Sequence, residues 1–351
     1  MLSRRVDGKS QLKSGETKMT EHEEAVQSLA FKDRKVGLVV FGILQIILGA
    51  FCALMVPFMI LGMIVSTVAP QDAAEGVNVR MMVPGALFYV LLAVWFIWVG
   101  IGSVKARRWA RALILVSSWI WLVCGACGLV LVLLFFPNMY DHMPENAEIP
   151  MAFVTVMKCV MIAFMAVFYV IVPGLLVMFY KSSNVKATCE YRDTKIRWTD
   201  KCPLPVLGVS LVCASWIVSM LFMGVYRWTI PFFGVVLSGI SGAIVALFMA
   251  LLFAYTAWGV YKLDLKAWWC AILVVVGWSI SAIVTFSRVD MQTFYQNMDF
   301  SQQQLDMIEQ YSAVWGYMNW FLGLWTVVIL AYLLYIRKYF TTGSQQEPIP
   351  S

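Results

Sequence analysis

The chain has 351 residues, of which 61% are apolar and only 13% are charged. Soluble domains are typically about half apolar and about a quarter charged, so this composition excludes a soluble globular protein. With 12 prolines, 23 glycines and 8 cysteines, the chain does not have the composition of a disordered segment, a collagen-like fibre or a small disulfide scaffold. We therefore expect an all-α integral membrane protein.

The two ends of the chain are polar. Residues 1–35 contain no apolar core of a signal peptide, and we expect residues 1–19 to be a disordered tail. The segment from Thr20 to Glu23 has the pattern of a capping box, which predicts an amphipathic interfacial helix over residues 20–35. Residues 341–351 are expected to form a C-terminal tail.

Eight apolar stretches are long enough to cross a bilayer, since about 30 Å of hydrocarbon takes roughly 20 helical residues. They cover approximately residues 36–69, 82–104, 109–136, 150–180, 204–226, 230–260, 267–287 and 312–336. Pro57 and Pro173 are predicted kink sites within them. Between the last two stretches, Ser301 and Gln304 predict a short capped helix on the outer leaflet, with Leu305 and Ile308 on one face.

The positive charges predict the orientation. Twenty-two Lys and Arg residues lie before the first span, after the last span or in alternate loops, whereas the other loops hold only Arg80, Arg227 and Arg288. By the positive-inside rule, both termini are then cytoplasmic. The net charge of +6 is explained by this topology, so no nucleic-acid partner is expected, whereas anionic lipid headgroups are.

The two halves show a weak internal similarity. At an ungapped offset of 159, Gly100, Arg107, Trp109, Ala112 and Trp119 fall on Gly259, Lys266, Trp268, Ala271 and Trp278. This indicates a first four-helix repeat over residues 36–180 and a second over 204–340. Because each repeat has an even number of spans, the two are expected to be parallel, related by an axis near the membrane normal.

Residues 181–203 form the predicted cytoplasmic linker between the repeats. The alternation of polar and apolar residues over 195–199 predicts a short strand or an interfacial tether. At Val185–Glu190 and Trp198–Pro205, the linker resembles a group of uncharacterised bacterial multi-pass membrane proteins. The resemblance implies a bacterial inner membrane and carries no known activity. Trp198 and Asp200, within this segment, are candidate functional residues.

Charged and polar residues within the spans are the next candidates. Lys158 is the only charge well inside an apolar stretch, where it can either snorkel to the headgroups or contact a substrate or partner. Gln45 can hydrogen-bond across helices. In the span over 230–260, small residues recur at every fourth position and predict a helix-packing face: Gly234, Ser238, Gly242, Ala246, Ala250 and Ala254.

Catalytic and metal-binding patterns are sparse. In the outer loop 137–149, Asp141, His142 and Glu145 lie close together, as acid-base chemistry requires, but their spacing matches no catalytic motif, and polar loop residues are usually only solvated. Cys124 and Cys127 have the redox spacing inside a span, where packing is the expected role. The linker cysteines, Cys189 and Cys202, are expected to be reduced thiols. We expect no cofactor and no metal.

These observations predict a non-catalytic accessory or scaffold subunit of the inner membrane, whose partners are lipids and either another membrane protein or a second copy of the chain. The alternative is a transporter or channel for an uncharged or lipid-like small molecule, which the repeats would suit. A membrane enzyme using His142 and its neighbours is the third possibility.

Overall fold

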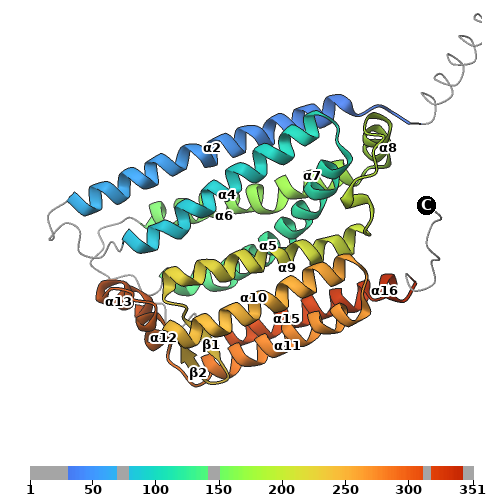
Figure 1. Cartoon of the computed structure of the whole chain (residues 1–351). Helices are drawn as coiled ribbons and strands as arrows, with labels where there is room; N and C mark the ends of the chain where they lie inside the picture. Colours follow the sequence, from blue (N-terminus) through green and yellow to red (C-terminus); the bar gives the residue numbers. More distant parts are fainter. Residues whose placement is uncertain (1–30, 69–78, 141–150, 311–317, 343–351) are drawn as a thin grey trace, which may run out of the picture.

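A computed structural model describes residues 31–68, 79–140, 151–310 and 318–342. Within these residues, eight helices are long and apolar enough to cross a membrane, so the chain has the architecture of a multi-pass membrane protein (Figure 1). The predicted disordered tail 1–19, most of the predicted interfacial helix 20–35 and nearly all of the tail 341–351 lie outside the described residues. Residues 31–34 are not helical, and the first span begins at Lys35.

Seven spans follow the predicted stretches closely, because apolar length determines them. They are α2 (Lys35–Val68), α4 (Val79–Val104), α5 (Arg108–Tyr140), the fourth span, α9 (Leu204–Phe222), α11 (Leu265–Phe286) and α15 (Met318–Ile336). The described residues also form short helices: α8 (Ser183–Arg192), η2 (Trp198–Asp200), η3 (Met223–Tyr226), α12 (Met291–Asn297), α13 (Gln302–Gln310) and α16 (Lys338–Thr342). The predicted helix after Ser301 is confirmed as α13, and its Leu305 is buried.

The fourth span is not a uniform α-helix. It consists of α6 (Met151–Ala166), a π-helical segment η1 (Val167–Ile171) and α7 (Val172–Lys181). Pro173, a predicted kink site, lies just after η1, where its missing N–H removes one backbone hydrogen bond. The other predicted site, Pro57, lies inside α2, which stays helical through it.

The predicted span over 230–260 is wrong in its first third. Residues Ile230–Phe232 (β1) and Val235–Leu237 (β2) form an antiparallel hairpin, and the sixth span, α10, covers only Gly239–Tyr261. Phe233 and Gly234 both have positive φ, as a two-residue hairpin turn requires, and their amides donate to Ser281 and Thr285 of α11. The run is apolar, so hydropathy did not separate the hairpin from the helix.

The predicted small-residue face is correspondingly shorter. Gly234 lies in the hairpin turn and Ser238 precedes α10, so neither belongs to the helix. Gly242, Ala246 and Ala250 are buried, and α10 packs mainly against α9, whereas Ala254 is exposed. Close helix approach is clearest elsewhere, between α2 and α4. A Cβ added at Gly42 would lie 2.9 Å from the carbonyl oxygen of Gly100.

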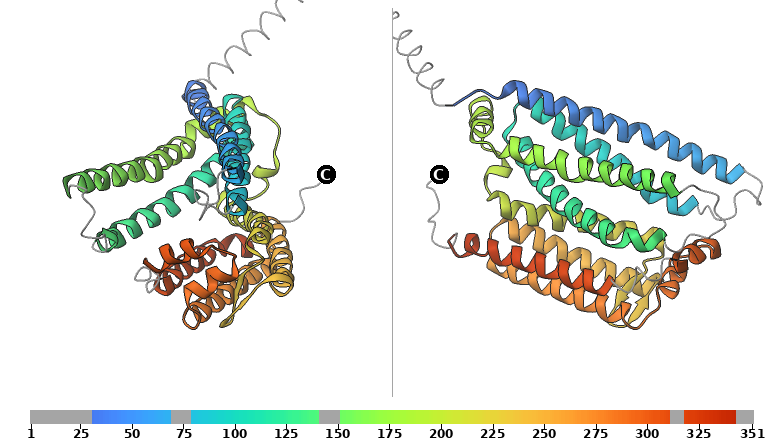
Figure 2. Two further views of the ribbon diagram at one scale, coloured as in Figure 1. Left: turned by 90° about the vertical axis from the view of Figure 1, so that its left-hand side faces the viewer. Right: turned by 180° about the vertical axis from the view of Figure 1, so that it is seen from behind.

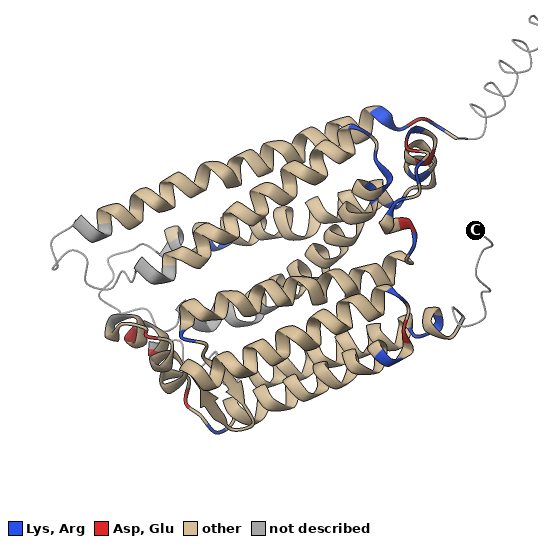
Figure 3. Cartoon of the chain, in the orientation of Figure 1, with Lys and Arg blue, Asp and Glu red and all other residues tan. Residues whose placement is uncertain are grey.

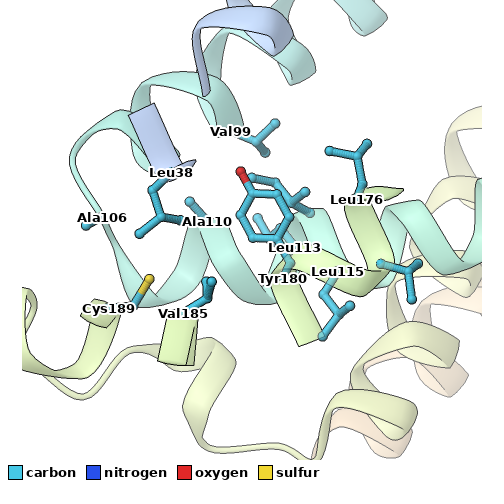
Figure 4. Packing of buried hydrophobic residues seen from close by; sticks show 12 residues of the cluster. Leu38, Val99, Ala106, Ala110, Leu113, Leu115, Leu176, Tyr180, Val185 and Cys189 are labelled. Atoms are coloured by element: carbon cyan, nitrogen blue, oxygen red, sulfur yellow. The ribbon is translucent and has the colours of Figure 1, made fainter. Parts of the chain in front are cut away.

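Consecutive spans pack against one another in both halves, α2 on α4 and α9 on α10 most extensively, while α5 contacts α9 between the halves. Figure 2 shows α5 and α6 extending to one side of the other spans. The first core cluster gathers around the fully buried Tyr180, whose hydroxyl lies 2.6 Å from Ser103 Oγ, with Leu38, Val99 and Leu113 around it (Figure 4). A second cluster surrounds Trp268 in the other half.

The turns before α5 and α11 have the same backbone geometry. Ala106 and Leu263 have φ of 49° and 61°, and the amides of Arg107 and Asp264 donate to the carbonyls of Gly102 and Gly259, each at 2.9 Å. Equivalent residues of these turns are 157 apart in sequence, not 159.

The ungapped alignment is therefore two residues out of register here. It pairs Trp109, the second residue of α5, with Trp268, the fourth residue of α11. Trp109 stacks on Trp98, whereas the Trp268 indole donates to the carbonyl of Leu333, so the two rings have different environments.

Candidate functional site

Most of the described Lys and Arg residues lie at one end of the helices, which we call the charged end (Figure 3). It comprises residues 31–35, 105–111, 181–203, 261–266 and 337–338. The predicted linker 181–203 occupies it as two short helices, α8 and η2, so the predicted strand over 195–199 is wrong. Asp200 is the reason, because its carboxylate accepts from the amide of Arg197 at 2.9 Å and closes the helical turn.

Asp193 holds the charged end together. Its side chain is 1% exposed and makes two hydrogen bonds with Arg197, whose Nη2 and Nε lie 3.0 and 3.2 Å from its oxygens. The amide of Arg108 and Nη1 of Arg107 also donate to this carboxylate, at 3.3 and 3.4 Å. Burial raises the pKa of Asp193, but these hydrogen bonds and positive charges together lower it below its ordinary value. The linker is thereby fixed to the start of α5.

Further ion pairs connect the linker to other spans. Arg192 pairs with Asp33, just before α2, at 2.7 Å. Arg108 of α5 lies 3.4 Å from both Glu190 of α8 and Asp200 of η2. The Nε of Arg111 donates to the carbonyl of Tyr180 at the end of the fourth span. The linker thus joins three spans of the first half at one end.

A cavity of about 300 Å³ lies among these groups, between α5, α8 and η2. We call it the α5–α8 cavity. Its charged lining consists of three cations and two carboxylates: Arg108, Arg111, Lys186, Glu190 and Asp200. Both α5 and α9 begin at this cavity, since Arg108 and Leu204 are in its wall. The N-terminal turns of two helices therefore border the cavity, and a helix N-terminus carries partial positive charge.

Thr199, in η2, also lines the α5–α8 cavity. It is 2% exposed, and its hydroxyl has no hydrogen-bond partner among the described residues. A buried hydroxyl without a partner costs about 1–3 kcal/mol, so such groups are uncommon in folded proteins.

Two thiols complete the wall of the cavity. Burial raises the pKa of Cys189 to about 11 and that of Cys202 to about 12. Both are therefore protonated at neutral pH, which disfavours nucleophilic or metal-binding roles. Among the described residues, no group of three or more His, Cys, Asp or Glu side chains could hold a metal ion.

A second, more open cavity of about 760 Å³ lies on the other side of η2, between α9 and α10. We call it the α9–α10 groove. Its wall is mostly apolar, including Ala214 and Ala254, with Lys201 and Lys262 at the charged end. Trp198 belongs to this wall, and its carbonyl accepts from the Tyr261 hydroxyl at 2.9 Å.

Among the described residues, the structure brings together two of those predicted as candidates. Trp198 and Asp200 are both in η2, the first in the α9–α10 groove and the second in the α5–α8 cavity. Gln45 is buried in α2 with an unpartnered Oε1, and Lys158 is half-buried in α6. Asp141, His142 and Glu145 lie outside the described residues.

The sequence analysis missed Arg108, Arg111, Asp193 and Thr199. For the charged residues a signal was present, because the short basic turn 103–111 and the linker acids lie on the same predicted side of the membrane. Pairing between them could have been expected on that ground. For Thr199 no such signal exists, since its unpartnered hydroxyl depends on three-dimensional packing.

The fold defines a multi-pass membrane protein with a polar site at one end of its spans. No known protein family matches the chain, and no characterised protein or solved structure is significantly similar to it.

Proposed function

We propose that the chain is a bacterial inner-membrane protein of two parallel four-helix repeats, with the charged end in the cytoplasm. The asymmetry of Lys and Arg supports this orientation, because the described chain both begins and ends at the charged end. The shared packing order of the spans and the matching turns before α5 and α11 support the repeats. Accessibility of a single cysteine introduced at Lys195, on either side of the membrane, tests the orientation.

We further propose that it acts as a non-catalytic accessory or scaffold subunit, binding another membrane protein or a second copy of itself. The observation that carries this proposal is the sparse packing of α6, whose main helical neighbour is α5. One face of α6 is uncovered, with Phe153, Val156, Val160 and Phe164 each more than half exposed. A partner's helix can pack on this face in place of lipid and gain van der Waals contact there.

The scaffold proposal is tested by purification in mild detergent followed by native mass spectrometry. We expect a stoichiometric complex that Val160→Glu dissociates. Leu273→Glu, on an exposed position of α11, is the matched control and should leave the complex intact. A wild-type chain that purifies as a stable monomer, or a complex equally sensitive to both changes, contradicts the proposal.

The α9–α10 groove favours a second candidate function, transport of an uncharged or lipid-like molecule. Its apolar wall runs into the spans, and lysines lie at its charged end. Proteoliposomes containing the purified chain should then move a fluorescent lipid analogue between leaflets. Ala214→Trp, which fills the groove, should stop this movement, whereas Leu273→Trp should not. The scaffold proposal expects no movement in any of these samples.

A further inference from the structure

We propose that the α5–α8 cavity binds a phosphate group. The inference goes beyond the scaffold proposal and does not depend on it. It rests on the cavity itself, on a residue of its wall with a buried, unpartnered hydroxyl, and on the cations and helix N-terminal residues that line it.

The Thr199 hydroxyl is the first indication of a ligand. The other buried threonines donate to backbone carbonyls: Thr188 to Asn184, Thr256 to Leu252 and Thr285 to Ser281 within their own helices, and Thr229 to Tyr226 and Asn297. Thr199 lines a cavity instead, and its hydroxyl makes no such bond. A hydroxyl in this position can donate to an acceptor held in the cavity, which recovers the cost of burying it.

The charges determine which acceptor fits. Arg108 is shared between the two carboxylates of the wall, at 3.4 Å from each. Lys186 lies 3.9 Å from Glu190, while Nε of Arg111 donates to the backbone carbonyl of Tyr180, and its Nη groups make no hydrogen bond or ion pair with the described residues. The Nη groups of Arg111 therefore remain for a ligand, and the wall as a whole carries one positive charge in excess.

The helix ends add to this preference. The first turns of α5 and α9 both border the cavity, and the positive end of each helix dipole favours an anion there, although the Arg108 amide already donates to Asp193 and Pro205 has no N–H. A planar guanidinium, a hydroxyl and helix N-termini together match the several acceptor oxygens of a phosphate. A bare cation is disfavoured by the same groups.

The phosphate can come from a phospholipid headgroup or from a soluble phosphate ester, and both present the same oxygens. The experiment separates the two sources. The full chain is purified in detergent in phosphate-free buffer, its bound phospholipid is measured, and binding of inorganic phosphate is followed by calorimetry. A phospholipid retained by the wild type and displaced by phosphate identifies a lipid source. Saturable phosphate binding without retained lipid identifies a soluble one.

Variants then locate the binding. Thr199→Val should weaken it about ten- to hundredfold, as expected for loss of a hydrogen bond to a charged acceptor, and Thr199→Ser should retain it. Arg111→Gln should also weaken it. The matched controls are Thr256→Val, at a buried threonine of α10, and Lys195→Gln, an exposed cation of the linker outside the cavity wall. Neither control should change the affinity.

Stability provides a readout that does not require ligand. Without phosphate or lipid, Thr199→Val should melt at the wild-type temperature or higher, because valine needs no partner. A lower melting temperature would show that the hydroxyl already has a partner within the protein, and would overturn the proposal. It is equally overturned if the wild type neither binds phosphate nor retains phospholipid, or if Thr199→Val binds as tightly as the wild type.

Discussion

Replacement of Asp193 by alanine tests how the charged end is held together. The side chain is 1% exposed and accepts four hydrogen bonds, of which the two from Arg197 are the shortest, at 3.0 and 3.2 Å. A hydrogen bond to a charged group contributes about 1.5–3 kcal/mol. The side chains of Arg197 and Arg107 are 30% and 41% exposed, so water replaces part of what they lose.

We therefore expect Asp193→Ala to lower the free energy of unfolding by about 2–3 kcal/mol, below the roughly 3–5 kcal/mol typical of breaking a fully buried pair. The measurement is reversible unfolding in mixed micelles, followed by tryptophan fluorescence. The control is Glu190→Ala, whose side chain is 41% exposed and whose ion-pair contacts are 3.4 and 3.9 Å. It should cost about 1 kcal/mol or less. Equal losses for the two variants, or no loss for Asp193→Ala, would refute this reasoning.

Three further predictions concern pH, helix contact and thiol reactivity. The pKa of Asp193 is lower in the folded protein than its ordinary value of 3.8. The stability that the Asp193 carboxylate contributes should therefore be complete above pH 3.8 and be lost as the pH falls through the pKa of the folded protein. Unfolding measured as a function of pH should show this loss in the wild type and not in Asp193→Asn. Gly42→Ala should destabilise the α2–α4 contact in thermal melts, since its Cβ would lie 2.8 Å from a Val104 methyl, whereas Gly128→Ala, with nothing within 4 Å, should not. Cys189 and Cys202, with raised pKa values, should resist iodoacetamide at pH 8 in the folded protein and react after unfolding in SDS, as mass spectrometry will show.

The spans could be predicted from sequence because one property, continuous apolar length, determines them. The fifth apolar stretch, predicted over 204–226, agrees with the helical residues Leu204–Tyr226. The prediction from apolar length was wrong at Ile230–Leu237, where an apolar run forms a β-hairpin. The difference depends on Phe233 and Gly234, whose positive φ and hydrogen bonds to α11 involve residues about fifty positions away.

The candidate site was less predictable for a similar reason. Asp200 could be chosen as one of few acids in the linker. Its role in the cavity wall, however, depends on an ion pair with Arg108, about ninety residues earlier in the chain. Asp193 looks like any other linker acid until α5 and α8 are packed together. Burial and pairing of charges are properties of the assembled end, so sequence pattern alone did not separate structural acids from cavity-lining ones.

The π-helical segment Val167–Ile171 has a consequence for the origin of the fourth span. A π-helical turn holds one residue more than an α-helical turn, so this segment has the form of a single-residue insertion absorbed without breaking the helix. Each α-helical residue turns the chain by about 100°. Five residues in the wider π-helical turn cover about the rotation that four α-helical residues cover, so deleting one residue from the segment would restore a continuous α-helix and leave α6 and α7 in nearly the same rotational relation. The segment thus adds one residue to the span, while the side chains of α6 keep the directions toward α5 and outward that a continuous helix would give them.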